Sequence, residues 1–266
     1  MRNDDAYANM PHIPGGADYP DRWAVEARQW RELQTALGRA RLNQSYGEAS
    51  REKYDLFYPR SRPEGLVVLI HGGFWLKFGR EDFSHLARGV TEAGWACAMP
   101  SYPLAPDVRI HEITRAMAAA TTAAAQLIAG PIALTGHSAG GHLAARLLCA
   151  DVDLPVRDRI SACVPVSPLS DLAPLIETTM NAQLKIDAAE ALAESPVYHR
   201  PAIDVPVTVV VGAAERPAFI DQARWLTEAW PGASLDLHEG RHHFDVIEAY
   251  EDPASSLVAA LTGATA

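Results

Sequence analysis

The hydrophobic pattern of this chain alternates between short apolar runs and longer amphipathic stretches. Continuous apolar runs such as 65–70 (GLVVLI) are typical of strands buried on both faces, whereas apolar residues spaced three and four apart predict helices. Strands are expected at 52–59, 65–70, 96–100, 131–136, 160–168, 205–213 and 233–240. Helices are expected at 21–42, 83–95, 113–128, 138–150, 217–230 and in the tail from residue 244. This alternation predicts an α/β fold with a mostly parallel central sheet and helices on both faces.

Two segments depart from the alternation and set the expected domain organisation. Residues 1–45 are expected to form an N-terminal helical segment packed on the core, because 21–42 has an apolar face at helical spacing. Residues 46–266 then form one domain, a length that a single α/β core accommodates. Within it, 171–199 has a mixed pattern, and we expect a small lid there.

Charge and composition exclude several classes of function. The formal net charge is −10 and no basic run offsets it, which argues against nucleic acid or an anionic membrane as a partner. The first sixteen residues have no apolar run typical of a signal peptide, so a cytoplasmic location is expected. Cys97, Cys149 and Cys163 lie in or beside apolar segments and are expected to be buried free thiols.

A G-x-S-x-G motif at 136–140 (GHSAG) is the strongest chemical signal. It stands between a predicted strand and a predicted helix, which is the setting of a nucleophile elbow. A sharp turn there exposes the central side chain, and glycines at both ends allow the neighbouring backbone to pass closely. Ser138 is therefore the candidate nucleophile.

An oxyanion hole is expected beside this serine. The strand 65–70 ends in His71-Gly72-Gly73, and glycines directly after a buried strand leave backbone N–H groups free to bind a ligand. The amide of Ala139, the residue after the nucleophile, completes the predicted hole. His71 is interpreted as an organiser of the loop rather than a base.

The base and the acid are expected in the chain order serine, acid, histidine. His242 and His243 follow the last predicted strand, and only one of these neighbours can point at Ser138. Glu215, in the loop after the strand 205–213, is the favoured acid. Asp221 lies a turn inside the next helix and is the competitor, with Asp171 as the next candidate.

These motifs together resemble the α/β-hydrolase superfamily, on the branch that holds hormone-sensitive-lipase-like esterases and kynurenine formamidases. HGGFW at 71–75 is closer to the H-G-G-x-W form of the formamidases than to the H-G-G-G of the esterases. Further matching stretches are GHSAGGHLAA, SYPLAP (101–106), SPLSDL (167–172), ERPAF (215–219) and HHFDVIE (242–248). The resemblance spans about residues 46–248. It implies Ser138 as nucleophile, His243 as base and Glu215 as acid, where the family more usually has Asp.

The resemblance also implies an activity, the hydrolysis of N-formylkynurenine to kynurenine and formate. Phe74, Trp75 and Tyr102 would then line an aryl pocket. A second hypothesis is a general carboxylesterase or amidase for short acyl chains, and a third is a hydrolase fold that only binds.

No cofactor and no metal are expected, since the chain has no G-x-G-x-x-G or P-loop, and His137 and His142 flank the elbow rather than chelate. The expected partner is a small-molecule acyl substrate, with no nucleic acid and no membrane. The sequence does not distinguish a monomer from a homodimer.

Overall fold

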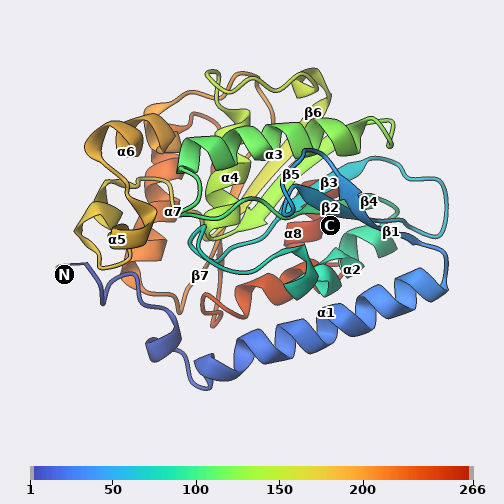
Figure 1. Cartoon of the computed structure of the whole chain (residues 1–266), viewed down its shortest axis with the longest axis horizontal. Helices are drawn as coiled ribbons and strands as arrows, with labels where there is room; N and C mark the ends of the chain where they lie inside the picture. The colour runs from blue at the N-terminus through green and yellow to red at the C-terminus, as the bar shows by residue number, and fades with distance from the viewer. Residues whose placement is uncertain (1–2, 264–266) are drawn as a thin grey trace.

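A computed structural model describes residues 3–263 and contains, within that range, one eight-stranded sheet flanked by helices (Figure 1). The strand order is β1-β2-β4-β3-β5-β6-β7-β8. The pairs β1–β2 and β2–β4 are antiparallel, and the pairs from β4 to β8 are parallel. The predicted α/β fold with a mostly parallel sheet is therefore confirmed.

The seven predicted strands correspond in order to the second to eighth strands of the structure, and the first strand is not predicted. The strands are β1 Ala40–Ser45, β2 Lys53–Phe57, β3 Leu66–Ile70, β4 Ala96–Pro100, β5 Ile132–His137, β6 Ile160–Val166, β7 Thr208–Gly212 and β8 Ser234–His238. The α-helices are α1 Tyr19–Ala36, α2 Arg88–Glu92, α3 Ile110–Ala125, α4 Ala139–Leu148, α5 Asn181–Leu184, α6 Ala188–Glu194, α7 Pro217–Ala229 and α8 Ser256–Thr262. None of the helices among residues 3–263 has both the length and the apolar character needed to cross a bilayer.

The sheet separates two hydrophobic cores. Side chains alternate across a strand, so Leu66, Val68 and Ile70 of β3 face one core while Val67 and Leu69 face the other. Helices α3, α4 and α7 cover the first core, and α1, α2 and α8 cover the second (Figure 1). Strands buried on both sides explain why the central runs of the sequence are apolar without alternation.

The expected helix at 21–42 is too long. Helix α1 ends at Ala36, and Gly38 follows with a φ of 67°, a left-handed conformation that commonly terminates helices. The chain then reverses into β1, whose residues alternate between half-buried and exposed positions as an edge strand. The segment 1–45 thus contributes a strand to the sheet in addition to its helix.

The segment 171–199 is a compact insertion of short helical elements. It contains the 3₁₀ turns η6 Ala173–Glu177 and η7 Pro196–Tyr198 together with α5 and α6. Side-chain bonds fasten it to α3 and the residue before it: Arg109 Nε donates to Glu190 at 2.8 Å, and Thr114 Oγ1 donates to Glu194 at 2.7 Å. The insertion is therefore anchored to the main domain by polar contacts between distant segments.

The three cysteines are free and buried, as expected. Burial raises the pKa of the thiols of Cys97, Cys149 and Cys163, which keeps them in the protonated form. Since the thiolate is the reactive form, these residues contribute to packing rather than to nucleophilic chemistry.

Candidate active site

Ser138 stands at a sharp turn between β5 and α4. Its φ of 57° and ψ of −117° are rare for a residue with a side chain. A Cβ on Gly140 would lie 2.0 Å from the carbonyl oxygen of Ile70, and a Cβ on Gly136 would lie 2.4 Å from the carbonyl oxygen of Gly140. Glycine is therefore required at both positions, because any side chain would collide with backbone. This strained strand–turn–helix is the geometry of a nucleophile elbow.

Glu215 and His243 form a buried acid–base pair. His243 Nδ1 lies 2.6 Å from Glu215 Oε2, and both side chains are almost completely buried. Glu215 Oε1 accepts hydrogen bonds from Ser167 Oγ at 2.5 Å and from the Gly212 amide at 2.9 Å. The carboxylate is thus held at both oxygens, and it fixes the orientation of the imidazole.

The pair leaves His243 Nε2 as the ring nitrogen available for proton transfer. Among the described residues, no hydrogen bond joins Ser138 Oγ to this histidine. Catalytic hydrogen bonds are commonly longer without a substrate and shorten when it binds. Ser138 and His243 are only 3% and 2% exposed, so the site is nearly closed to solvent.

The alternative base and acids lie elsewhere. His242 Nε2 lies 3.2 Å from the Tyr19 hydroxyl, and its Nδ1 accepts from the amides of Phe244 and Asp245. Asp221 is exposed and pairs with Arg224 at 3.9 Å. Asp171 accepts from the Ala173 amide and from the hydroxyl of Tyr198. The structure therefore brings Glu215, and neither aspartate, to His243.

The glycine loop after β3 lies against the elbow. A Cβ on Gly72 would fall 2.9 Å from the His137 carbonyl oxygen and 3.2 Å from Ser138 Cβ, so this backbone nearly touches the candidate nucleophile. Gly73 has a φ of 106°, which turns the loop. The amide of Ala139 is the first of α4 and has no partner within the helix. These backbones surround the place where an oxyanion would form.

His71 and Tyr102 contact the glycine loop and each other. The His71 ring stacks on Tyr102 at a centroid distance of 4.2 Å, and its Nδ1 lies 2.8 Å from the Gly72 carbonyl oxygen. The Tyr102 hydroxyl donates to the His71 carbonyl oxygen at 3.0 Å. Burial lowers the pKa of His71 to about 4, so its imidazole is neutral. These contacts agree with the interpretation of His71 as a loop organiser.

Two of the three expected pocket residues are core residues instead. Trp75 and Tyr102 have no solvent exposure, and Trp75 packs edge-on against His142 at 5.0 Å. The positive φ angles of Phe74 (52°) and Trp75 (58°) reverse the chain after the glycines. Phe74 is half-buried and lies 6.4 Å from Phe219. Of the three, only Phe74 has exposed surface that a substrate could contact.

Sequence reasoning missed three residues around the imidazole. Phe219 in α7 lies 4.3 Å from the His243 ring, and Tyr7 packs on Phe219 at 5.8 Å. Ser167, as described above, supports Glu215. Phe219 ends the ERPAF stretch and stands on the apolar face of α7, so helical spacing could have found it. No periodic signal marks Tyr7, because it lies in an irregular N-terminal segment.

His137 also borders the imidazole, at a ring distance of 4.5 Å from His243. Burial, and then the proximity of His243, hold the pKa of His137 well below its usual range. His137 is therefore a neutral neighbour, which does not repel the positive charge that His243 gains when it accepts a proton.

Although no metal is expected, one histidine pair of the sequence does have metal-binding spacing. Residues 238–242 read HEGRH, which matches the zinc motif H-E-x-x-H. That motif requires a helix, but here β8 ends at His238 and Gly240 turns the chain with a φ of 71°. His238 contacts Asp236 at 3.1 Å, whereas His242 contacts Tyr19. The two rings therefore do not form a metal site.

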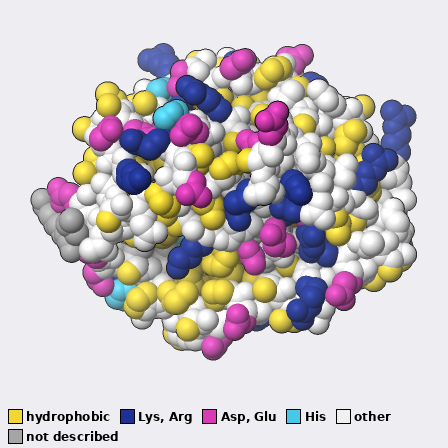
Figure 2. All heavy atoms as spheres, in the orientation of Figure 1, with side chains coloured by type: hydrophobic (Ala, Val, Ile, Leu, Met, Phe, Trp, Pro, Cys, Tyr) yellow, Lys and Arg dark blue, Asp and Glu magenta, His cyan; other side chains and the backbone are white. Residues whose placement is uncertain are grey.

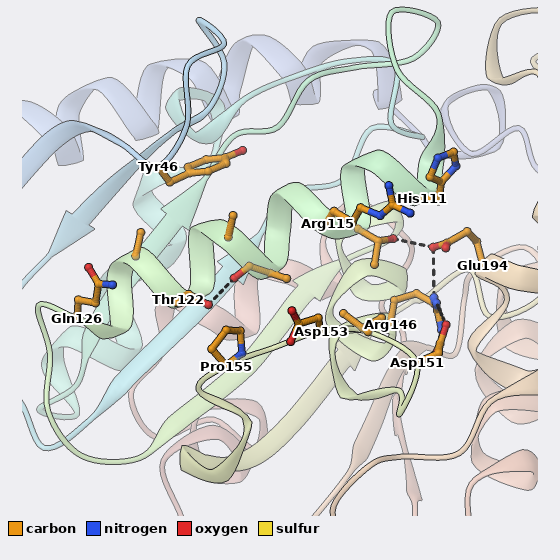
Figure 3. Close-up of a pocket in the computed structure, with 15 residues that line it drawn as sticks. Tyr46, His111, Arg115, Thr122, Gln126, Arg146, Asp151, Asp153, Pro155 and Glu194 are labelled. Carbon is orange, nitrogen blue, oxygen red and sulfur yellow. Dashed lines mark hydrogen bonds and ion pairs between the residues drawn. The ribbon is translucent and has the colours of Figure 1, made fainter.

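A cavity of about 740 Å³ lies over α3, away from Ser138 (Figure 3). Its most buried charge, Arg146, bonds to Glu194 and to both oxygens of Asp151, as the dashed lines in Figure 3 show. On the face of the molecule seen in Figure 2, acidic and basic side chains are interspersed. A paired guanidinium has little left to offer a ligand, so we place the chemistry at Ser138 instead.

Comparisons with known proteins agree with this architecture. A profile of the α/β hydrolase fold matches residues 67–229. Kynurenine formamidase of Danio rerio is 31% identical over 224 residues, which cover 78% of this chain and 75% of that protein. A crystal structure from Silicibacter sp. TM1040, named as a proposed thioesterase, is 54% identical, with a TM-score of 0.95 over 98% of this chain and 99% of that one.

Esterase B of Lactobacillus rhamnosis shares the fold at 19% identity, with a TM-score of 0.66 over 87% of this chain and 90% of that one. The chain belongs to the α/β hydrolase fold family. Within it, the relatives named as kynurenine formamidases indicate that this protein is a hydrolase.

The acid can be tested by charge removal. We expect Glu215→Gln to lower kcat by more than about a hundredfold, because a neutral amide neither stabilises the imidazolium nor favours the correct tautomer. Asp221→Asn, on the exposed side of α7, is the matched control and should change kcat less than about threefold. Steady-state rates on one ester substrate measure both variants. Equal, mild effects would mean that another group completes the triad.

Proposed function

We propose that this protein is a serine hydrolase whose triad is Ser138, His243 and Glu215. The observation that supports it best is the 2.6 Å contact between His243 Nδ1 and the Glu215 carboxylate, next to a strained serine elbow. The other oxygen of this carboxylate accepts two hydrogen bonds. Ser138 Oγ attacks the acyl carbon and His243 accepts its proton. Glu215 keeps the imidazole oriented and stabilises its positive charge.

The remaining steps use the same groups. The amides of Gly73 and Ala139, with Gly72 shaping the loop, donate to the oxyanion of the tetrahedral intermediate. His243 then returns its proton to the leaving nitrogen or oxygen, and the acyl–Ser138 ester forms. A water molecule, deprotonated by His243, hydrolyses this ester and releases the acid.

We propose a formyl group on an aryl amide as the substrate, with N-formylkynurenine as its representative. The 31% identical Danio rerio protein carries the name of that activity. Ser138 and His243 are almost completely buried, which favours a small acyl group over a large one. Phe74, which is half-buried and lies 6.4 Å from Phe219, offers aromatic surface to the aryl leaving group.

A second candidate is a carboxylesterase or amidase for short acyl chains. The fold shared with esterase B and the 54% identical structure named as a proposed thioesterase favour it. The same triad and oxyanion hole would act on oxygen and sulfur esters. The two candidates differ in the size of the acyl pocket and in the leaving group.

Matched substrates separate the candidates. We expect kcat/KM for N-formylkynurenine to exceed that for its N-acetyl analogue by about a hundredfold, since one extra methyl group in a tight pocket costs about 1–3 kcal/mol. p-Nitrophenyl acetate and butyrate, and an acetyl thioester, measure the alternative. Equal values for the formyl and acetyl amides, or a strong preference for butyrate, would reject the formamidase proposal in favour of a short-chain esterase.

A further inference from the structure

Three side chains from distant segments meet on the side of the sheet covered by α1. They are Glu26 of α1, His85 of the 3₁₀ turn η4 (Ser84–Ala87) and Glu251 at the end of the 3₁₀ turn η8 (Val246–Glu251). One ligand atom of each lies within 4.8 Å of the others. The three residues line one cavity of about 370 Å³. Figure 1 shows α1, in blue, running along this side of the molecule below α2.

His85 is a buried polar side chain without a hydrogen bond. The residue is 1% exposed, and within residues 3–263 its Nδ1 is buried without a hydrogen-bond partner. Its Nε2 faces Glu26 beyond hydrogen-bond distance. The nearest charged atom is Glu26 Oε2, 3.6 Å from Nε2. Buried polar groups are nearly always bonded, and this one requires an explanation.

The surrounding charges leave the cavity open to a cation. Arg88 contacts Glu251 Oε2 at 2.9 Å, and Arg22 contacts Glu248 at 3.4 Å. Arg241 also contacts Glu248, at 2.8 Å, so Glu248 has two guanidinium partners. Within residues 3–263, Glu26 has no arginine partner, and its carboxylate faces His85. Glu251 contacts Arg88 through Oε2, which leaves its second oxygen, Oε1, available.

We propose that Glu26, His85 and Glu251 form a binding site for a divalent transition-metal ion of the zinc class. One imidazole and two carboxylates are a donor set that zinc accepts, whereas magnesium and calcium prefer oxygen ligands alone. Ligand atoms around tetrahedral zinc lie about 3.3 Å apart, close to the 3.6 Å that separates His85 from Glu26. Glu26 is partly exposed on a surface helix and can move the remaining distance.

The bound ion would fasten α1 to the rest of the domain. Its three ligands come from three elements, and they would add to the packing of Trp23 and Trp30 and to the polar contact of Arg31 with Asp55. A ligand that binds only the folded state raises stability by mass action. The proposed role is therefore stabilisation, and no catalytic step depends on it. Because the two arginines compete with the ion, the affinity should be below that of structural zinc sites with thiolate ligands.

Isothermal titration calorimetry with zinc chloride on the chelator-treated full-length protein tests this proposal. We expect one ion per chain with a Kd below about 0.1 mM, and a rise in Tm of about 4 °C or more at a hundredfold excess over Kd. The double variant Glu26→Gln/Glu251→Gln should weaken binding at least about thirtyfold while keeping the fold, since both positions reach solvent. His85→Asn should weaken it similarly.

Glu248→Gln is the matched control, because it removes a neighbouring carboxylate outside the proposed ligand set, and it should change Kd less than about threefold. Absence of binding to the wild-type protein at 1 mM zinc would overturn the proposal. So would unchanged binding in the double variant. Loss of binding in His243→Ala, with binding retained in the double variant, would assign the ion to the catalytic pair. None of these measurements depends on turnover, so the proposed function is tested separately.

Discussion

Ser138→Ala should lower kcat by about four orders of magnitude or more, because triad members act as a unit and removal of the nucleophile abolishes acyl transfer to the enzyme. Alanine keeps the Cβ of serine, and Ser138 Oγ makes no hydrogen bond within the described residues. The variant should therefore fold like the wild-type protein. Rates on p-nitrophenyl acetate, with enzyme concentration high enough to detect residual turnover, measure the loss.

Thermal unfolding of the same variant is the control, and we expect its Tm to stay within about 3 °C of the wild-type value. A folded Ser138→Ala protein that retains more than about a tenth of the wild-type kcat would contradict the assignment of the elbow serine.

His243→Ala should cause a loss of about the same size as Ser138→Ala, because without the imidazole nothing accepts the serine proton or protonates the leaving group. The buried Glu215 carboxylate would also lose its partner. His242→Ala is the matched control at the adjacent position. His242 contacts Tyr19 and the amides of the following turn, so its removal should cost some stability and change kcat less than about tenfold.

Single-turnover kinetics on both variants separate acylation from deacylation. A severe loss in His242→Ala together with a mild loss in His243→Ala would transfer the role of base to His242.

The parts of the fold and site that the sequence predicts well are local in the chain. Continuous apolar runs identify the buried strands because both of their faces are covered. The elbow around Ser138 is a contiguous motif of five residues, and the glycines that its geometry requires, Gly136 and Gly140, are part of that motif. Glu215 and His243 follow strands whose carboxyl ends meet at one sheet edge, so element order alone brings them near each other.

The parts that the sequence does not predict depend on long-range contacts. Whether His242 or His243 points at the site is decided by Tyr19, more than 200 positions earlier. Strand β1 carries no long apolar run because it is an edge strand, and its first residues continue the helical pattern of α1. The sequence does not show that Trp75 and Tyr102 are buried. For Trp75, the burial follows from the reversal of the chain after Gly73. Glu26, His85 and Glu251 meet only in the folded chain.

Covalent labelling tests the central claim most directly. Serine hydrolases with an accessible acyl site react with small sulfonyl and phosphonyl fluorides, which trap the activated nucleophile. After incubation with phenylmethylsulfonyl fluoride or a short-chain phosphonofluoridate, peptide mass spectrometry should find one adduct per chain, on Ser138, with activity lost in proportion. The label should be absent in His243→Ala, since Ser138 is then not activated. An adduct on another serine, or full activity after stoichiometric labelling elsewhere, would contradict the proposed triad.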